Sequence, residues 1–567
     1  MNKFLKSVDN QIFLISIIIS IPAVLALIPK GFYGASDEVH IAWLYEMYET
    51  IKLGQIPPRF VPDLSFGHGY PLFNFVFPLP YYIGTLFHYI GFSLVDSVKL
   101  LFFLSVPFSA FFMYKLLRQF SNTFLSLVGT ILYIYSPYRS TDIYVRGAIG
   151  EVFSFVFLPL ILLSFVKITN KENSEEIKVG WIGIAGLSIA FLILSHNITS
   201  YMFLPIALIF ALFRLSGLKW SRVSINAVFV AVLLGLLGSC YFWIPAILES
   251  SLMKYSTVFD FWDHFPTLRQ LVTPYFGYGA SVPGPGDGIS FFMGLANLAV
   301  LVLTTSVFLF KYKKLEKSDK SILVWSYLVV FISIFMMNYR STFLWKTIPF
   351  MPYFQFPWRF LTLVSFTTPL LVISLKYFRT EKFIATILII LVFLSFPYFR
   401  PQDFLGRTDE YYLAKYIPYP EIKAEYYTQQ EEYLRLPKSV EEKPTLRSGI
   451  HTLQKEGFGG IFNPKEGRLG MEAVVYSTSD TVLSYGKYYF PGWTVYDNGK
   501  KIKAFGSQPF GEVTFVLKGK GDHNVKIYFR ETSFRLALNV VSLLSIIFCL
   551  FLIFKNRLVN SKIKTKI

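Results

Sequence analysis

The residues best suited to carry chemistry gather in one stretch that follows the first apolar run of the chain. Asp37, Glu38 and His40 open this stretch, and His68 lies further along it. Ionisable side chains beside a membrane-spanning segment cost free energy, so they usually have a function. A carboxylate such as that of Asp37 can act as a general base that takes a proton from an attacking hydroxyl group. The same acids could instead offset a helix dipole, and the local sequence leaves both interpretations open.

Arginines are the second set of candidates. Arg59, Arg146 and Arg359 are predicted to lie on the same side of a membrane as these acids. A planar guanidinium group binds two phosphate oxygens at once, so the three residues together indicate an anion site. For each arginine alone, snorkelling at the membrane surface is the alternative, as is ion pairing with Asp142 or Glu151.

Other polar residues could line a cavity or hold a metal ion. His196 ends an apolar run, and it is either a further phosphate ligand or a histidine that completes a helix end. The sequence contains no His-Glu-x-x-His motif and no glycine-rich phosphate loop after a strand. A divalent cation at Glu38 with His40, or at Asp263 with His264, stays open, and no other cofactor is indicated. The remaining candidates for a cavity lining are His68, Asp142, Glu151, Gln355 and Trp358.

The composition indicates a protein that crosses a membrane many times. Of the 567 residues, 53% are hydrophobic and 16% are charged, whereas soluble domains carry about 25% charged residues. The net charge of +18 does not indicate a nucleic-acid partner. The basic residues form short clusters between apolar runs, as in the cytoplasmic loops of membrane proteins. Cys240 and Cys549 both lie inside apolar runs, so no structural disulfide is expected.

Charge decides how the apolar runs are counted. Runs of about 20 residues span a bilayer, and their number predicts about twelve transmembrane helices. Prolines interrupt run 71–92, and we interpret it as interfacial or re-entrant because the basic clusters then fall on one side. Both termini are then cytoplasmic, and the first external loop comprises residues 30–96. The cytoplasmic side includes Lys3, Lys6, Lys171 and Lys219.

Two further predictions concern this end of the chain. Run 11–29 is interpreted as a retained helix rather than as a cleaved signal peptide, because it is long enough to span. Within the external loop, helical spacing of apolar residues predicts an amphipathic helix over 37–53 that lies on the membrane. Ser36 would cap its start, and Gly54 would end it.

The domain organisation follows from a change of composition near residue 400. Residues 1–399 form the predicted membrane part, and 400–532 read as a polar domain outside the cell. Residues 533–567 are a last transmembrane helix with a basic cytoplasmic tail. Alternation from about residue 471 onward predicts a β-sandwich.

Two hairpins are predicted inside this sandwich. The first turns at Asn498-Gly499, a dipeptide that favours tight hairpin turns. The second would pair residues 512–517 with residues 524–529.

Several motifs resemble a known family of bacterial and archaeal membrane proteins. Among them are Gly67-His-Gly-Tyr-Pro-Leu-Phe, Arg146-Gly-Ala-x-Gly-Glu151 and Gln355-Phe-Pro-Trp-Arg-Phe. They resemble the family called 6-pyruvoyl-tetrahydropterin synthase-related. Pterin synthesis itself is not expected, because the seven histidines are scattered over unrelated segments, whereas such a synthase needs a zinc-binding cluster. The stretch from Tyr489 to Lys500 is similar to the external β-domain of multi-pass proteins that glycosylate lipoteichoic acid.

The resemblance extends to the GT-C superfamily of membrane glycosyltransferases. It implies an inverting transfer of sugar from a polyprenyl-phosphate donor in the membrane to a cell-envelope glycan or glycolipid outside. Asp37 would be the general base, assisted by Glu38 or His40. Two alternatives stay open: a lipid or polysaccharide transporter or flippase, and a non-enzymatic cell-envelope membrane protein. The implied ligands of the donor phosphate are Arg59, Arg146, Arg359 and His196.

Overall fold

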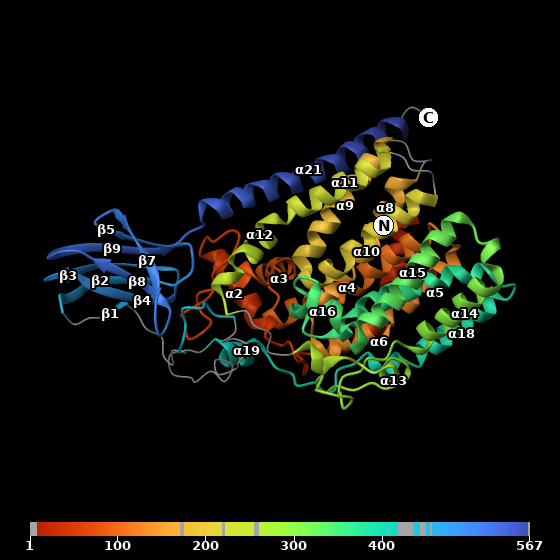
Figure 1. The fold of residues 1–567 in the computed structure, drawn as a ribbon, viewed down its shortest axis with the longest axis horizontal. Helices are drawn as coiled ribbons and strands as arrows, with labels where there is room; N and C mark the ends of the chain where they lie inside the picture. Colours follow the sequence, from red (N-terminus) through yellow and green to blue (C-terminus); the bar gives the residue numbers. More distant parts are fainter. Residues whose placement is uncertain are drawn as a thin grey trace.

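The structure is a computed structural model in which a helical membrane part carries a β-sandwich at one end (Figure 1). It describes residues 8–170, 175–217, 222–254, 260–417, 435–442, 450–453 and 456–564. Lys3, Lys6, Lys171 and Lys219, which were expected on the cytoplasmic side, lie outside these ranges. The fold class expected from the sequence is confirmed: apolar helices, then a β-sandwich, then a last apolar helix.

The described residues contain 10 helices that are long and apolar enough to cross a membrane, or 11 if one bent pair is a single span. That pair is α11 (Arg222–Gly238) and α12 (Cys240–Glu249), which meet at an angle of 65°. A shorter apolar helix, α5 (Thr123–Ile134), corresponds to one of the twelve crossings that the sequence predicts. The other spans are α1 (Val8–Val24), α4 (Leu94–Leu117), α7 (Ile149–Ser154) with α8 (Phe157–Thr169), α9 (Glu175–Ser195), α10 (Asn197–Gly217), α14 (Leu295–Lys311), α15 (Lys317–Met336), α17 (Leu361–Thr367) with η10 (Thr368–Tyr377), α18 (Glu381–Phe393) and α21 (Ser533–Lys564).

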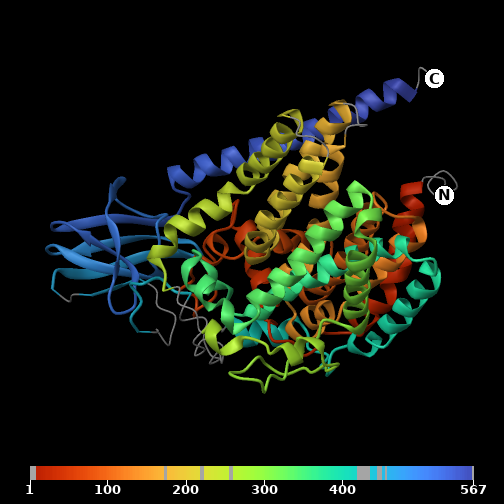
Figure 2. The same ribbon diagram turned by 45° about the vertical axis from the view of Figure 1, so that its right-hand side comes forward.

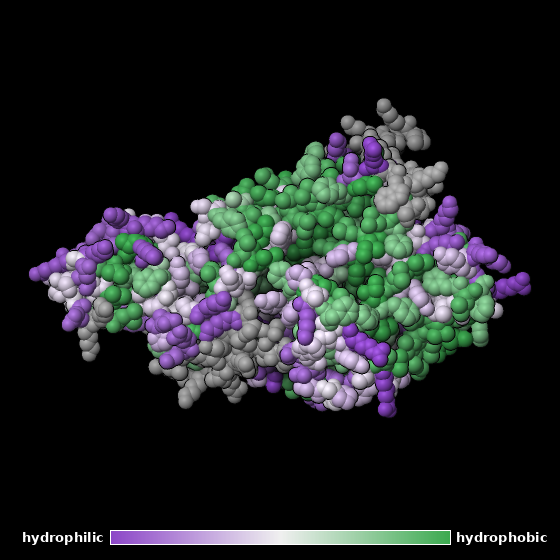
Figure 3. Space-filling model, in the orientation of Figure 1, coloured by the Kyte–Doolittle hydropathy of each residue, from purple (hydrophilic) through white to green (hydrophobic). Residues whose placement is uncertain are grey.

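The arrangement of these helices separates two ends of the molecule. Figure 1 shows both chain termini at the end away from the β-sandwich, and α21 runs the whole distance between the two ends. Figure 2 shows α21 lying along α11 and α9, against which it packs. Apolar side chains gather over the helices, whereas hydrophilic side chains predominate over the β-sandwich (Figure 3). This distribution is that of a helical bundle with a lipid-facing surface and a domain in water.

The loop between α1 and α4 contains two short helices, α2 (His40–Lys52) and α3 (Leu79–Tyr89). With 11 residues, α3 is too short to span, in agreement with the interfacial or re-entrant interpretation of 71–92. Helix α2 differs from the expectation in two ways. It begins at His40 rather than near residue 37, because residues 36–39 form a turn. It is also buried nearly all round rather than lying on the membrane, because α3, α4 and α19 (Asp409–Tyr416) pack against it.

The β-sandwich consists of two antiparallel sheets. The strand orders are β1-β4-β8-β7 and β2-β3-β9-β5-β6. Its core includes Val475, Tyr485, Trp493 and Phe515. The strands are β1 (Ile450–Thr452), β2 (Phe458–Gly467), β3 (Gly470–Ser477), β4 (Thr481–Tyr488), β5 (Trp493–Asp497), β6 (Lys500–Ile502), β7 (Ala504–Ser507), β8 (Glu512–Leu517) and β9 (Gly521–Phe529).

The sandwich confirms one predicted hairpin and corrects the other. Strands β5 and β6 pair around Asn498 and Gly499, whose φ angles of 48° and 79° suit a tight turn. The predicted pairing of β8 with β9 is wrong, because β8 pairs with β4 and β7 whereas β9 belongs to the other sheet. The chain crosses between the sheets at this point, and alternation within a strand does not reveal which partner it takes. The sheets also begin earlier than residue 471, with β1 and β2.

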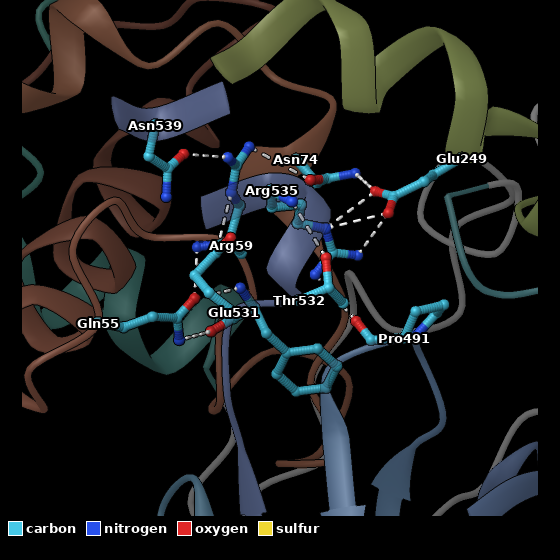
Figure 4. A network of polar contacts seen from close by, with 10 residues as sticks. Gln55, Arg59, Asn74, Glu249, Pro491, Glu531, Thr532, Arg535 and Asn539 are labelled. Carbon is cyan, nitrogen blue, oxygen red and sulfur yellow. Dashed lines mark hydrogen bonds and ion pairs between the residues drawn. The ribbon is translucent and has the colours of Figure 1, made fainter. Parts of the chain in front are cut away.

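A segment of the first external loop completes the core of the sandwich. Phe60 is fully buried among the sandwich residues, with its ring centroid 5.3 Å from that of Trp493 and 5.2 Å from that of Phe529. The preceding residue, Arg59, joins the sandwich to α21 (Figure 4). Its Nε lies 3.1 Å from an oxygen of Glu531, and its Nη2 donates to Asn539 over 3.0 Å. The β-sandwich and the first external loop therefore pack as one body.

Candidate functional site

A cavity of about 770 Å³ lies between the first external loop and the ends of several spans. Its walls come from residues 34–37, 39–40, 43, 75–77, 145–146, 148, 150–151, 196–198, 278–281, 289, 353, 355–356, 358–359, 402–403, 416 and 435. The volume is in the range of sites that enclose a small molecule. The predicted candidates in its lining are Asp37, His40, Arg146, Glu151, His196, Gln355, Trp358 and Arg359.

Glu38 is held away from this cavity by two cations. Its carboxylate oxygens lie 2.9 Å from Nη1 of Arg407 and 2.7 Å from Nζ of Lys415. Both cations belong to the segment after α18, and the Glu38 side chain is buried. Glu38 was predicted to act beside Asp37, but it is not among the cavity residues. Its two ion pairs instead hold the turn in place.

Asp37 occupies the same turn but faces the cavity. Its main-chain N–H donates to the carbonyl oxygen of Arg146 over 2.7 Å. The hydroxyl of Ser36 donates to the same oxygen over 3.2 Å, so Ser36 does not cap a helix as predicted. The half-buried Asp37 carboxylate makes no hydrogen bond or ion pair within the described part of the chain. The turn thus presents one carboxylate whose oxygens are available to a ligand.

His40 lies one residue beyond this turn and is neutral. Burial lowers the pKa of His40 to about 4, and the charge of Asp37 only partly offsets this effect. Its Nδ1 lies 2.6 Å from the hydroxyl oxygen of Tyr81. The Trp43 ring lies beside it, with centroids 5.5 Å apart. A neutral imidazole at this place can donate or accept a hydrogen bond without competing for the charge of Asp37.

Arg146 is bound by two buried carboxylates. Its Nη1 lies 2.5 Å from an oxygen of Asp142 and 2.6 Å from an oxygen of Glu151. Its guanidinium group also stacks over the ring of Trp358, 4.9 Å from the centroid. Burial raises the pKa of Asp142 well above its usual range, and the charge of Glu151 adds to that effect. The ion pairing of Arg146 with Asp142 and Glu151, which the sequence left open, is therefore present. These acids compensate the positive charge of Arg146.

An unusual turn brings these groups together. Thr141–Arg146 form a single π-helical turn, a conformation that often marks functional sites. Gly147 follows with φ of 70°, a left-handed conformation that glycine adopts without strain. The turn directs the Arg146 side chain toward Glu151 of α7 and its carbonyl oxygen toward Asp37.

Arg359 is a cavity cation that forms no ion pair with Asp142 or Glu151. Its Nη1 donates to the carbonyl oxygen of Phe354 over 3.0 Å, and its Nε has no hydrogen-bond partner in the described ranges. Its guanidinium group lies over the Phe356 ring, 5.3 Å from the centroid. Within those ranges no carboxylate lies at ion-pair distance from Arg359. It is therefore the cation best placed to meet an anionic ligand.

His196 contributes a neutral hydrogen-bond donor. Burial lowers the pKa of His196 to about 3. The main-chain N–H of Thr199 donates to His196 Nδ1 over 3.3 Å, and the Thr199 hydroxyl lies 2.7 Å from the same nitrogen. Because Nδ1 accepts, the ring proton belongs on Nε2. His196 thus completes a helix end and also lines the cavity, which joins the two roles that the sequence left open.

The structure places three other predicted residues outside the cavity. Arg59 is fully buried in the joint with the β-sandwich, so it is not positioned to bind a phosphate in the cavity. His68 is buried against Tyr488, with ring centroids 5.2 Å apart, and it does not line the cavity. Asp142 lies behind Arg146 rather than in the lining. Arg59 and His68 are positioned by partners far away in the sequence, whereas Asp142 pairs with Arg146 four residues further along.

Comparison with known proteins identifies the family. A family model described as "6-pyruvoyl-tetrahydropterin synthase related domain; membrane protein" matches residues 73–401. The chain belongs to this family of membrane proteins. A Lactococcus lactis subsp. cremoris (strain MG1363) protein described as uncharacterized is 25% identical over 251 residues. That match covers 43% of this chain and 40% of the relative, so the chain spans less than half of it.

Among solved structures, this family member is similar to the Archaeoglobus fulgidus oligosaccharyltransferase. The apo form is 12% identical, with a TM-score of 0.44 over 70% of this chain and 56% of that chain. The same archaeal enzyme, AglB, with an inhibitory peptide and a dolichol-phosphate gives 12% identity and a TM-score of 0.43 over the same shares. TM-scores below 0.5 do not establish a common fold, so activity rests on the residues of the cavity.

Two residue pairs, Glu38 with His40 and Asp263 with His264, were left open by the sequence as a site for a divalent cation. Across the ranges that the structure describes, no group of three or more His, Cys, Asp or Glu side chains could hold a metal ion. The pair Glu38 and His40 is divided, because Glu38 binds Arg407 and Lys415. His264 Nδ1 lies 2.9 Å from the hydroxyl oxygen of Ser281.

Several cavity residues of this family member were missed from the sequence. Trp43, Gln402, Asp403, Tyr416 and Arg435 all line the cavity. Trp43 stood in a predicted membrane-surface helix, and the others lie in a stretch without a periodic pattern. No local signal marks them. The described residues 400–417, which carry Gln402, Asp403 and Tyr416, reach the cavity through long-range contacts with residues 32–38.

Proposed function

We propose that this chain is a GT-C-like membrane glycosyltransferase. It moves a sugar from a polyprenyl-phosphate donor to a hydroxyl group of a cell-envelope acceptor. The observation that carries the proposal is that the Asp37 carboxylate, unlike the neighbouring polar side chains, has no bonding partner among the described residues. Among the polar side chains of residues 36–40, all described, those of Ser36, Glu38 and His40 are bonded, whereas the Asp37 carboxylate is available in the cavity.

Asp37 serves as the general base. It takes the proton of the acceptor hydroxyl, whose oxygen attacks the anomeric carbon of the donor. The bond between that carbon and the phosphate oxygen breaks, and the lipid phosphate leaves with the electron pair. A single displacement of this kind inverts the anomeric centre.

Arg359 and His196 stabilise the leaving phosphate. Arg359 supplies the positive charge that is not used by Asp142 or Glu151. His196 donates a hydrogen bond from Nε2. Preorganised donors and charges of this kind act most strongly where charge develops in the transition state. Arg146 is a positioning residue, because its guanidinium group is bound by carboxylates and its carbonyl oxygen holds the Asp37 main chain.

The cavity opens on the outer face of the plasma membrane in this proposal, and the β-sandwich also lies outside. Both chain termini are then cytoplasmic. Lys311, Lys313 and Lys314 support this orientation, since they sit at the end of α14 remote from the cavity. Short basic loops favour the cytoplasmic side.

The test uses purified protein in lipid nanodiscs, without a gradient, and polyprenyl-phosphate hexoses (glucose, galactose, mannose and N-acetylglucosamine). We expect the natural protein to consume at least one donor. Asp37→Asn should lower that rate by roughly 10²–10⁴-fold, the usual contribution of a general base. Asp263→Asn is the matched control, because Asp263 is exposed and lies outside the cavity.

Two results would contradict the proposal. Full activity of Asp37→Asn would remove Asp37 as the base. Movement of intact donor across the membrane, with no bond broken, would instead favour the transporter.

A further inference from the structure

Two cations of the cavity lining, Arg435 and Arg359, lie over different aromatic rings, those of Trp43 and Phe356. Arg435 lies over the Trp43 ring, 5.0 Å from the centroid, and Trp43 adjoins His40. Burial is the main reason that the pKa of His40 is low, and the charge of Arg435 lowers it further. Burial is likewise the main reason that the pKa of His196 is low, and the charge of Arg359 lowers it further. Asp37 lies three residues before His40, and its main-chain N–H donates to the Arg146 carbonyl oxygen.

The cavity lining also contains polar groups without partners. Trp43 is 4% exposed, and its indole N–H has no hydrogen-bond acceptor among the described residues. The side chains of Gln402 and Asp403 likewise make no hydrogen bond within that part of the chain. Tyr416 adds an aromatic wall, with its hydroxyl 3.4 Å from Glu38 Oε1. The proposed base and leaving-group site do not use these residues.

The segment that carries Gln402 and Asp403 is fixed in place. The main-chain N–H of Gly34 donates to the Asp403 carbonyl oxygen over 3.3 Å, and Phe32 pairs with Arg407 in an antiparallel bridge. Further along, the Asp409 carboxylate accepts from the N–H groups of Leu94 and Val95 at the start of α4, over 2.8 and 2.9 Å. The main chain that carries the exposed side chains of Gln402 and Asp403 is therefore held in position before any ligand arrives.

We propose that Trp43, Gln402, Asp403, Tyr416 and Arg435 form the acceptor subsite, and that the acceptor presents a neutral sugar there. The inference rests on the proposed glycosyltransferase function and names its acceptor class. A carboxylate and a carboxamide bind neighbouring hydroxyl groups, while aromatic faces cover the apolar side of a sugar ring. One guanidinium and one carboxylate leave this subsite without net charge, which suits an uncharged ligand.

This placement completes the reaction geometry. The sugar hydroxyl bound between Asp403 and Asp37 gives its proton to the Asp37 carboxylate. Its oxygen forms the new bond to the anomeric carbon of the donor. The old carbon–oxygen bond breaks, and its electron pair goes to the phosphate beside Arg359.

The experiment separates the acceptor subsite from the catalytic step. Hydrolysis of the polyprenyl-phosphate hexose by water is measured without acceptor, and transfer is measured with p-nitrophenyl β-glucoside or with glycerol 3-phosphate. Asp403→Asn and Trp43→Phe should raise the KM for the glucoside on the order of tenfold each, the effect of one lost hydrogen bond, and leave donor hydrolysis unchanged. Glu410→Gln is the matched control on the same segment, since Glu410 is exposed and outside the cavity.

Each other result overturns the subsite. Unchanged glucoside KM in both variants would do so, as would an equal fall in donor hydrolysis, which would indicate a general loss of structure. Preference for glycerol 3-phosphate, or hydrolysis without transfer to the glucoside, would exclude a neutral sugar. Absence of donor consumption by the natural protein would instead refute the proposed function itself.

Discussion

The main-chain N–H of Asp37 donates a hydrogen bond to the carbonyl oxygen of Arg146, with nitrogen and oxygen 2.7 Å apart. The guanidinium group of the same arginine is enclosed by the carboxylates of Asp142 and Glu151. One residue therefore fixes the position of the proposed base through its backbone and neutralises two buried acids through its side chain. Arg146 and Arg359 thus have separate tasks, and substitutions should distinguish them.

Arg146→Gln should destabilise the protein. The substitution leaves the buried Glu151 carboxylate, which shares Arg146 with Asp142, without a cation, and breaking a buried pair costs about 3–5 kcal/mol. We expect a lower Tm in thermal unfolding of the purified protein. The double variant Arg146→Gln with Glu151→Gln should recover part of the loss, because one unpaired charge is removed. A Tm equal to that of the natural protein would contradict the structural role of the pair.

Arg359→Gln should impair catalysis and leave the fold intact. In the described ranges Arg359 Nη1 bonds one carbonyl oxygen and no carboxylate, so its removal strands no buried acid. Loss of a charge that stabilises the leaving phosphate should lower kcat roughly 10²–10³-fold. Steady-state kinetics with the donor measure this, and Arg359→Lys should restore part of the rate. An unchanged kcat would assign the phosphate to another cation.

Glu46 should make stability depend on pH. Burial raises the pKa of this α2 carboxyl from its usual 4.5 to about 8, so the folded protein retains a proton that the unfolded chain releases. The folded state is favoured fully below about 4.5, and this contribution is lost as the pH rises through 8. Thermal unfolding between pH 5 and pH 9 should show a falling Tm that flattens in Glu46→Gln. Parallel curves for the two proteins would show that Glu46 is ionised throughout.

Phe60→Ala should loosen the external loop and the β-sandwich together. The ring fills the core between Trp493 and Phe529, and removing such a side chain costs about 3–5 kcal/mol. Limited proteolysis should become faster in both segments at once. Phe505→Ala serves as the control, because Phe505 is 38% exposed on β7. Faster cleavage in one segment alone would show that the two do not fold as one body.

The sequence predicted the helices, strands and turns better than it predicted which of them pack together. Hydropathy and charge identified the apolar helices and the interrupted run 71–92, because both signals depend on burial in lipid. The turn at Asn498-Gly499 was recognisable because few dipeptides adopt its backbone angles. The pairing of β8 and the burial of α2 were not. Alternation does not show that β8 takes β4 as its partner, and α2 is covered in part by α19, which lies far along the chain.

The same distinction applies to the candidate site. Asp37, Arg146, His196 and Arg359 were singled out by residue type and by the predicted side of the membrane, and they line one cavity. Residue type could not separate Asp37 from its neighbour Glu38. That separation depends on Arg407 and Lys415, which approach Glu38 from more than 360 positions further along the chain.

The burial of Phe60 inside the sandwich bears on how this architecture could be rearranged by engineers or by recombination. Residues 450–529, cut out and produced alone, would present an apolar hollow where that ring belongs. If the sandwich were fused to another membrane protein, its core would lack the Phe60 ring unless a fragment around residues 55–77 were included. The core of the sandwich is therefore assembled from two separate stretches of sequence, and it cannot be transferred as one continuous segment.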